Sequence, residues 1–182
     1  MSKKNISSAD FNPSYIGQRD DIVRLIPEPA KNVLDIGCST GALGQQLKQR
    51  NNATVIGIEI NQEMAILAST ILDKVIIADV EDITFSKHFT LAHFDCIILA
   101  DILEHLKDPW RVIKNLTTIL SNDGTVIVSI PNVRHYSTIM NLVLKGLWPF
   151  EIERDDECEH LHVIHEDLHK CRHDSLAFSV PS

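Results

Sequence analysis

Short, almost continuously apolar segments alternate with segments of helical periodicity along most of the chain. Five of these segments are rich in β-branched residues and have the length of strands: 32–37, 54–60, 74–79, 94–100 and 125–130. Strands that are apolar on both faces are typical of parallel sheets covered by helices on both sides. The pattern therefore predicts an α/β domain.

Helices are predicted between the strands, each with an apolar face. One apolar stripe follows a potential N-cap at Asn61 and consists of Met64, Leu67, Ala68, Ile71 and Leu72. A second follows the helix-start pair Asp108-Pro109 and consists of Trp110, Val112, Ile113, Leu116 and Leu120. We expect both stripes to pack in the core, and Asn12-Pro13 to start a further helix before the first strand.

The alternation predicts a doubly wound, Rossmann-like sheet, and we suppose that its strand order is 3-2-1-4-5. Because crossovers between parallel strands are right-handed, the winding direction reverses between the first and fourth strands. Ligands bind such sheets at the carboxyl ends of the strands beside this reversal. The segments GCSTG (37–41) and ADILEHLKDP (100–109) are therefore expected to face one cleft. We expect a single domain over residues 1–182, with residues 13–131 as its ligand-binding core.

Composition and charge narrow the class of partner. The formal net charge is -8, and no basic stripe runs along the sequence, so we expect no nucleic-acid partner. No run of 18 apolar residues predicts a membrane span, and the start, MSKKNISSADFN, lacks the apolar segment of a secretory signal. The 4 cysteines are widely scattered. This usage is typical of a reducing compartment, and we expect a cytoplasmic location.

Acidic residues stand at the ends of three consecutive predicted strands: Asp35, Glu59 and Asp79. Asp35 would repel a pyrophosphate but suits a cationic group, and the phosphate-loop pattern GxxxxGK[ST] is absent. Glu59 is placed to accept from ribose hydroxyls, which alone fits a dinucleotide such as NAD equally well. Asp79 either accepts from an adenine amino group or begins a solvated loop with Glu81 and Asp82. Together the three acids indicate a ligand with adenosine, a positive pole and no phosphate.

Four segments together resemble the successive motifs of class I S-adenosylmethionine-dependent methyltransferases of the small-molecule type: VLDIGCSTG, IGIEI, IIADVED and FDCIILADILEHLKDP. The resemblance extends over about residues 13–165. It implies S-adenosylmethionine as the cofactor and methyl transfer to a small-molecule acceptor. Because a sulfonium is a good leaving group, alignment and exclusion of water supply much of the catalysis in such enzymes. Whether O, N or C is methylated does not follow from these motifs.

The resemblance also implies roles for individual residues at the cofactor. Asp35 is expected to orient the loop and the amino group, Glu59 to hold the ribose, and Asp79 to accept from adenine. The other positions assigned to the cofactor are Gly37, Cys38 and Gly41 beside its methionine part, Ile60 packed on adenine, Val80 and Ala100 near the strand ends, and Tyr15 and Arg19 near its carboxylate. Ser39 stands where the family more often has glycine.

His105 and Asp101, which both follow the fourth strand, are candidates for a catalytic role. His105 lies one turn past the strand, and a histidine has the pKa that a general base needs near neutrality. Its alternative is a surface or structural role. Asp101 is the second candidate, as a base or a substrate ligand. Residues 132–150 contain the apolar stretch expected either to cover the acceptor or to pack as a core helix.

Other functional classes remain as alternatives. HEDLH (165–169) satisfies the metalloprotease pattern H-E-x-x-H, in which His165 and His169 share a helix face and Glu166 serves as base. Too little chain follows for such a domain, so we expect neither a zinc hydrolase nor a metal site. An NAD-binding Rossmann domain is a further alternative. The last alternative is a partner protein that binds the cofactor but is catalytically weak.

The end of the sequence predicts a shortened sheet. The family's sheet continues beyond strand five with a hairpin of two strands. Here EHLHVIHEDLHK (159–170) resembles the start of the next helix, and LAFSV (176–180) offers at most one short strand. We therefore expect the last two strands to be missing or reduced, with residues 132–182 forming an acceptor-side cover and a shortened tail. Strand five is then expected to be an open edge, so that the protein is either marginally stable or associates with a second copy through that edge. We expect activity to be low or absent even if the cofactor binds.

Overall fold

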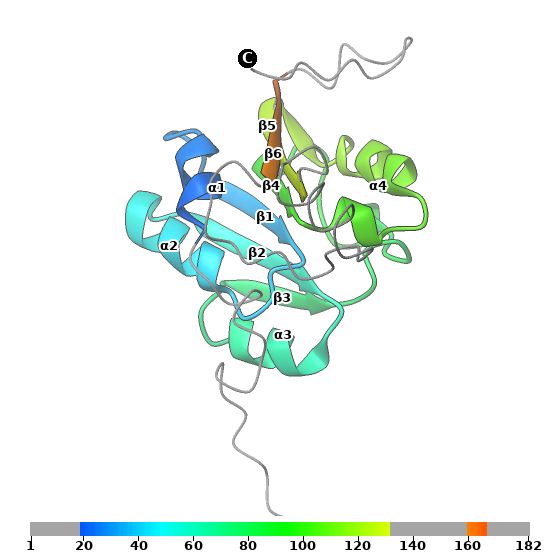
Figure 1. Cartoon of the computed structure of the whole chain (residues 1–182), viewed down its shortest axis with the longest axis horizontal. Helices are drawn as coiled ribbons and strands as arrows, with labels where there is room; N and C mark the ends of the chain where they lie inside the picture. Colours follow the sequence, from blue (N-terminus) through cyan, green and yellow to red (C-terminus); the bar gives the residue numbers. More distant parts are fainter. Residues whose placement is uncertain (1–18, 132–159, 167–182) are drawn as a thin grey trace, which may run out of the picture.

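The computed structural model describes residues 19–131 and 160–166 of the chain. Its sheet has the order β3-β2-β1-β4-β5-β6 (Figure 1). The parallel strands are β1 (Asn32–Ile36), β2 (Thr54–Glu59), β3 (Lys74–Ile77), β4 (Phe94–Ala100) and β5 (Leu120–Pro131). Strand β6 (His160–Glu166) runs antiparallel to β5. The predicted α/β class and the strand order 3-2-1-4-5 are confirmed.

Helices connect the strands of the described part. They are α1 (Asp20–Leu25), α2 (Ala42–Asn51), α3 (Gln62–Ala68), α4 (Pro109–Leu116) and the short 3₁₀ helices η3 (Phe85–Lys87) and η4 (Leu103–His105). Both predicted N-caps are confirmed. The Asn61 side chain accepts hydrogen bonds from N–H groups in the first turn of α3, and the Asp108 side chain accepts one from the N–H of Arg111 in α4. Asn12-Pro13 lies outside the described residues. None of the described helices has the length and apolarity that a membrane span requires.

Side chains alternate between two apolar cores, one on each face of the sheet. Along β1, Val33 packs with the core of α1 and α2, whereas Leu34 and Ile36 pack with the core of α4. This follows from the two-residue period of a strand. On the α4 side, Phe94 is fully buried and meets Phe89 edge to face at 4.9 Å between ring centroids. The two cores hold the strand ends in a fixed arrangement, from which the loops project.

The second predicted apolar stripe is partly wrong. Helix α4 ends at Leu116, and Leu120 begins β5, where it pairs with Phe94. The hydroxyls of Thr117 and Thr118 donate back to carbonyls of the last helical turn, and the chain leaves the helix there. Trp110 is 54% exposed instead of packed in the core, because it lies in the first turn of α4, away from the buried face.

The helix after Asn61 is shorter than the predicted apolar stripe, because α3 ends at Ala68. Leu72 nevertheless remains buried, in the turns that follow. Strand β3 is an edge of the sheet. Its Ile77 is 53% exposed, so this strand does not fit the predicted burial on both faces.

The expected open edge at strand five is wrong. Strand β6 pairs with β5 from Thr125↔Glu166 to Pro131↔His160, and this ladder satisfies backbone groups along residues 125–131. Residues 160–166, which are part of the segment that resembled the start of a helix, therefore form a strand. Association of two copies through the β5 edge loses its basis.

The same strand also bears on the metalloprotease alternative. His165 and Glu166 belong to β6, whereas the H-E-x-x-H chemistry requires both histidines on one helix. His169 lies outside the described residues. The extended backbone at residues 165–166 is thus not the geometry of that motif.

Candidate functional site

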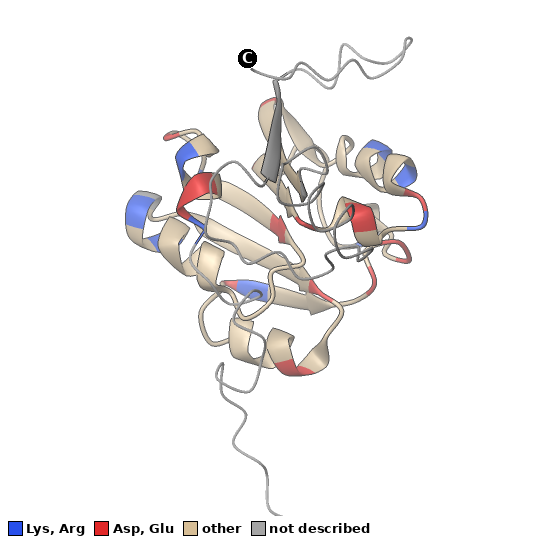
Figure 2. Cartoon of the chain, viewed as in Figure 1, with Lys and Arg blue, Asp and Glu red and all other residues tan. Residues whose placement is uncertain are grey.

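The predicted strand-end acids come together at the carboxyl edge of the sheet. Ile36 of β1 is in register with Ile58 of β2 and Leu99 of β4, and Glu59 with Ile77 of β3. The loops after β1, β2, β3 and β4 therefore leave the sheet at the same edge (Figure 1). In Figure 2, acidic residues lie at several of these strand ends, whereas Lys and Arg lie mainly on helices.

The loop after β1 depends on left-handed backbone. Gly37 and Gly41 have φ of 73° and 86°, and Ser39, where the family more often has glycine, has φ of 49°. The N–H groups of Gly37 and Cys38 both donate to the carbonyl of Ile58, which holds the loop against β2. Gly41 is the N-cap of α2, and a Cβ there would lie 3.2 Å from Cα of Ala68. The loop is thus packed closely on α3.

Glu59 organises two of the loops. Its side chain is buried, one carboxylate oxygen accepts the Ser39 N–H at 2.9 Å, and the other accepts the Asn61 N–H at 2.8 Å. Each oxygen has a further lone pair for another donor. This role of Glu59 is not evident from the sequence, because no local pattern shows that Ser39 faces Glu59 across the β1–β2 pair.

Asp35 is a buried carboxyl group at the same edge. It is 3% exposed, and its Oδ2 atom has no hydrogen-bond partner among the described residues. Burial, and then the neighbouring charge of Glu59, raise the pKa of Asp35 to about 7, which Arg19 partly opposes. A buried oxygen without a partner is unfavourable. A ligand that brings a cation or a donor to Oδ2 would offset this cost.

The raised pKa of Asp35 predicts a specific dependence of stability on pH. Because the folded chain holds this proton more tightly than the unfolded chain, whose value is near 3.8, the free energy of unfolding should fall as pH rises from about 4 to about 7. Above pH 7 the loss is complete. Asp35→Asn should remove this component, so the variant should gain stability relative to the parent across that window. Urea denaturation at several pH values measures it, and parallel curves for the two proteins would contradict it.

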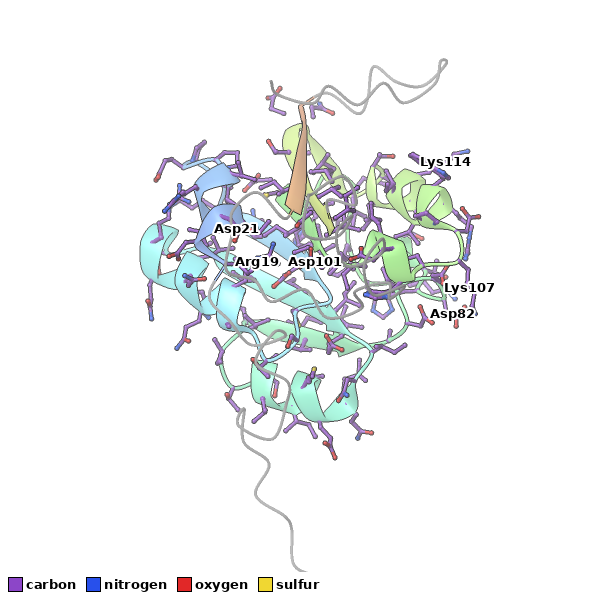
Figure 3. The ribbon with its side chains drawn as sticks, in the orientation of Figure 1. Arg19, Asp21, Asp82, Asp101, Lys107 and Lys114 are labelled. Carbon is purple, nitrogen blue, oxygen red and sulfur yellow. The ribbon has the colours of Figure 1, made fainter. Side chains whose placement is uncertain are left out.

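Arg19, at the N-cap of α1, joins three segments (Figure 3). Its guanidinium donates to Asp101 at 2.6 Å, to Asp21 at 2.9 Å and to Ser129 at 3.2 Å. The Ser129 hydroxyl in turn donates to the other Asp101 oxygen at 2.9 Å. Burial works against the charge, but Asp21 and Asp101 raise the pKa of Arg19 above its ordinary value. This cluster ties α1 to the ends of β4 and β5.

The Arg19–Asp101–Ser129 cluster bears on the roles that were assigned to Asp101 and Arg19. Asp101 has φ of 55°, and both of its carboxylate oxygens accept hydrogen bonds, so it is held rigidly. Arg19 directs most of its donors to protein groups instead of to an open position. Both residues lie at the predicted edge, and contact between either one and a ligand remains a prediction. Tyr15 lies outside the described residues.

The remaining assigned residues differ in exposure. Ile60 is 67% exposed at the end of β2, which leaves an apolar surface open to a planar ring, whereas Val80 is buried in the α4 core. Asp79 uses one oxygen to accept the Glu81 N–H at 2.9 Å. His105 is exposed in η4. Ala100 is the half-buried last residue of β4.

The family of the chain follows from comparison with known proteins. Residues 15–174 match the family model described as a methyltransferase domain. An uncharacterized protein of Methanocaldococcus jannaschii is 35% identical over 63% of this chain and 42% of its own length. The ubiquinone biosynthesis O-methyltransferase of Stutzerimonas stutzeri is 29% identical over 68% of this chain and 53% of its own length. The chain spans about half the length of the curated relatives it matches.

Solved structures share the fold. A SAM dependent methyltransferase from Archaeoglobus fulgidus has a TM-score of 0.60 and 18% identity, and the match covers 79% of this chain and 66% of that one. A possible histamine N-methyltransferase from Thermotoga maritima has a TM-score of 0.56 and 23% identity, over 70% of this chain and 56% of that one. At these identities the likeness establishes the arrangement of the sheet and helices.

Proposed function

The chain belongs to the methyltransferase domain family, and from this premise we propose that it binds S-adenosylmethionine and transfers the methyl group to a small-molecule acceptor. The observation that carries the proposal is the meeting of Asp35, Glu59 and Asp79 at one edge of the sheet. The orphaned, buried Oδ2 of Asp35 fits a ligand with a positive pole. A pyrophosphate would be repelled there by the carboxylates of Asp35 and Glu59.

The geometry supports the assigned order of contacts along the cofactor. Gly37, Cys38 and Gly41 would lie at the methionine part, where Asp35 meets the ammonium group. Glu59 has lone pairs left to accept from the ribose hydroxyls while it holds the loop. The exposed Ile60 would pack on adenine, and the second oxygen of Asp79 would accept from the adenine amino group. The other positions assigned to this site are Val80, Ala100, Tyr15 and Arg19.

The cofactor supplies a methyl group on a sulfonium, which leaves readily as a neutral sulfide. The protein's part is therefore to align the acceptor and to exclude water. The Arg19–Asp101–Ser129 cluster fixes the start of the loop after β4, on which His105 is carried. His105 is exposed and so is placed to take a proton from an acceptor that arrives protonated. Asp101 would orient the acceptor.

Several relatives support an acceptor of low molecular mass. The ubiquinone biosynthesis O-methyltransferases align with more than half of this chain. The proposal extends to the division of the chain into a cofactor core at residues 13–131 and an acceptor side at residues 132–182. It also includes a cytoplasmic location, in keeping with the scattered cysteines, of which Cys38 and Cys96 are free thiols.

Calorimetry and turnover test the proposal on the full chain. S-Adenosylhomocysteine should bind at least tenfold more tightly than NAD, because Asp35 disfavours a pyrophosphate at the loop. Incubation with methyl-labelled S-adenosylmethionine and a panel of phenols, carboxylates and amines should label one class of acceptor. Tighter binding of NAD would overturn the cofactor assignment. Tight S-adenosylhomocysteine binding without any labelled product would favour the non-catalytic alternative.

His105 provides the catalytic arm of the same experiment. His105→Ala should lower turnover roughly tenfold with little change in S-adenosylhomocysteine affinity, since the ring is exposed and contributes less than a buried base. His88→Ala, which removes another exposed histidine just after η3, is the matched control and should leave turnover unchanged. Equal turnover in both variants would return His105 to a surface role.

A further inference from the structure

Glu81 makes contacts that the assigned site does not explain. Its side chain is only 9% exposed, although it lies in a loop. One carboxylate oxygen accepts the N–H of Asp108 at 2.9 Å, and the other accepts the N–H of Lys107 at 3.2 Å. Its backbone carbonyl accepts from the Arg111 guanidinium at 3.1 Å. Figure 3 labels Lys107, and it labels Asp82, which follows Glu81 in the chain.

These hydrogen bonds join two loops with different proposed tasks. The loop after β3 carries Asp79, the proposed acceptor for the adenine amino group, and the Glu81 N–H donates to Asp79 itself. The loop after β4 carries His105, two residues before Lys107. Glu81 is therefore the direct link between the adenine end of the proposed site and the segment that would face the methyl acceptor.

The chemistry of the link suits a rigid connection. The Glu81 carboxylate accepts hydrogen bonds from two N–H groups that immediately precede α4. No preceding helical turn supplies an acceptor for N–H groups at this position. Both contacts are charge-assisted, and the guanidinium of Arg111 lies 3.9 Å from the carboxylate. A buried carboxylate held by two donors has little freedom, so displacement of the loop after β3 also displaces the start of α4.

We propose that Glu81 is a positioning residue that couples occupation of the adenine subsite to ordering of residues 101–108. This inference rests on the proposed function, because the subsite is part of it. A ligand that contacts Asp79 restricts the loop at residues 78–82. The carboxylate of Glu81 then holds Lys107 and Asp108, and the segment that carries His105 is fixed before the acceptor arrives.

Amide hydrogen exchange on the full chain tests the coupling with three probes: adenosine, methionine and S-adenosylhomocysteine. Adenosine and S-adenosylhomocysteine should slow exchange in residues 101–108 by about tenfold or more in the parent, and methionine should not. Glu81→Ala should abolish this response, and Glu81→Gln, which keeps one acceptor oxygen, should retain part of it. Asp82→Asn, which removes the neighbouring exposed charge, should respond like the parent.

The outcomes separate the two claims. If S-adenosylhomocysteine does not bind the parent, the proposed function fails, and the coupling fails with it. If it binds while exchange at 101–108 stays the same, or slows equally in Glu81→Ala, the coupling alone is overturned. If Glu81→Ala does not fold, the partial response of Glu81→Gln decides, together with Arg111→Met, which removes the guanidinium beside the Glu81 carbonyl and carboxylate but leaves the carboxylate in place. A full parental response in both variants would contradict the proposal.

Discussion

Glu59→Ala is expected to weaken binding of S-adenosylhomocysteine by about 100-fold. The parent carboxylate holds the N–H groups of Ser39 and Asn61, so its loss releases both loops at once. It also removes the proposed acceptor for the ribose. Hydrogen bonds to a charged group contribute roughly 1.5–3 kcal/mol each, and part of this is recovered when water replaces the lost oxygen.

Two variants sharpen this prediction, and calorimetry measures it. Glu59→Gln keeps one acceptor oxygen and should lose about tenfold in affinity. Glu63→Ala removes an exposed acid from the first turn of α3 and should bind like the parent. Thermal denaturation establishes that each variant is folded. An affinity for Glu59→Ala within twofold of the parent would remove Glu59 from the site.

Gly37→Ala is expected to lower the free energy of unfolding by about 2–4 kcal/mol and to weaken cofactor binding at least tenfold. At φ of 73° an alanine costs roughly 1–2 kcal/mol. The new Cβ would also lie 2.2 Å from Cδ1 and 2.8 Å from Cγ1 of Ile102, and such overpacking costs roughly 1–3 kcal/mol. Relief of the clash either turns the Ile102 side chain, on the loop after β4, or moves the loop after β1. Both loops belong to the proposed site.

Urea denaturation of a small series separates strain from clash. Ser39→Gly occupies the same loop, also with positive φ, and should be neutral or slightly stabilising. Ile102→Ala combined with Gly37→Ala should recover the clash component but not the backbone component. Stability of Gly37→Ala equal to the parent would mean that the loop accommodates a side chain at this position, contrary to the close packing described here.

The predictions for Glu59 and Gly37 each combine one feature that the sequence reveals with one that only the structure reveals. The sequence predicted that GCSTG (37–41) faces the cleft, whereas the positive φ of Gly37 became evident only in the structure. The clash partner, Ile102, is distant in the chain and was not identifiable from it. Similarly, the three acids were readable as strand ends, whereas the N–H groups that Glu59 holds became evident only from the register of β1 against β2.

The sequence by itself determined the features that depend on neighbours along the chain. Apolar runs predicted the positions of the five parallel strands, and Asn61 and Asp108 predicted two helix starts, because capping and strand periodicity act over a few residues. The strand order 3-2-1-4-5 was supposed for such a sheet and is confirmed, although right-handed crossovers alone leave other orders open. The carboxyl edge with Asp35, Glu59 and Asp79 was therefore locatable without a structure.

The tertiary structure decided what depends on partners far apart in sequence. Strand β6 extends because β5 offers it a backbone ladder, and no local signal in residues 160–166 distinguished that pairing from a helix start. Likewise, Arg19 meets Asp101, and Glu81 meets Lys107 and Asp108, only when the strands are assembled. The unpaired Oδ2 of Asp35 is a consequence of burial by the whole sheet. Pairing and burial are properties of the packed molecule, because hydrogen-bond geometry and exclusion of water are set by groups that the local sequence does not contain.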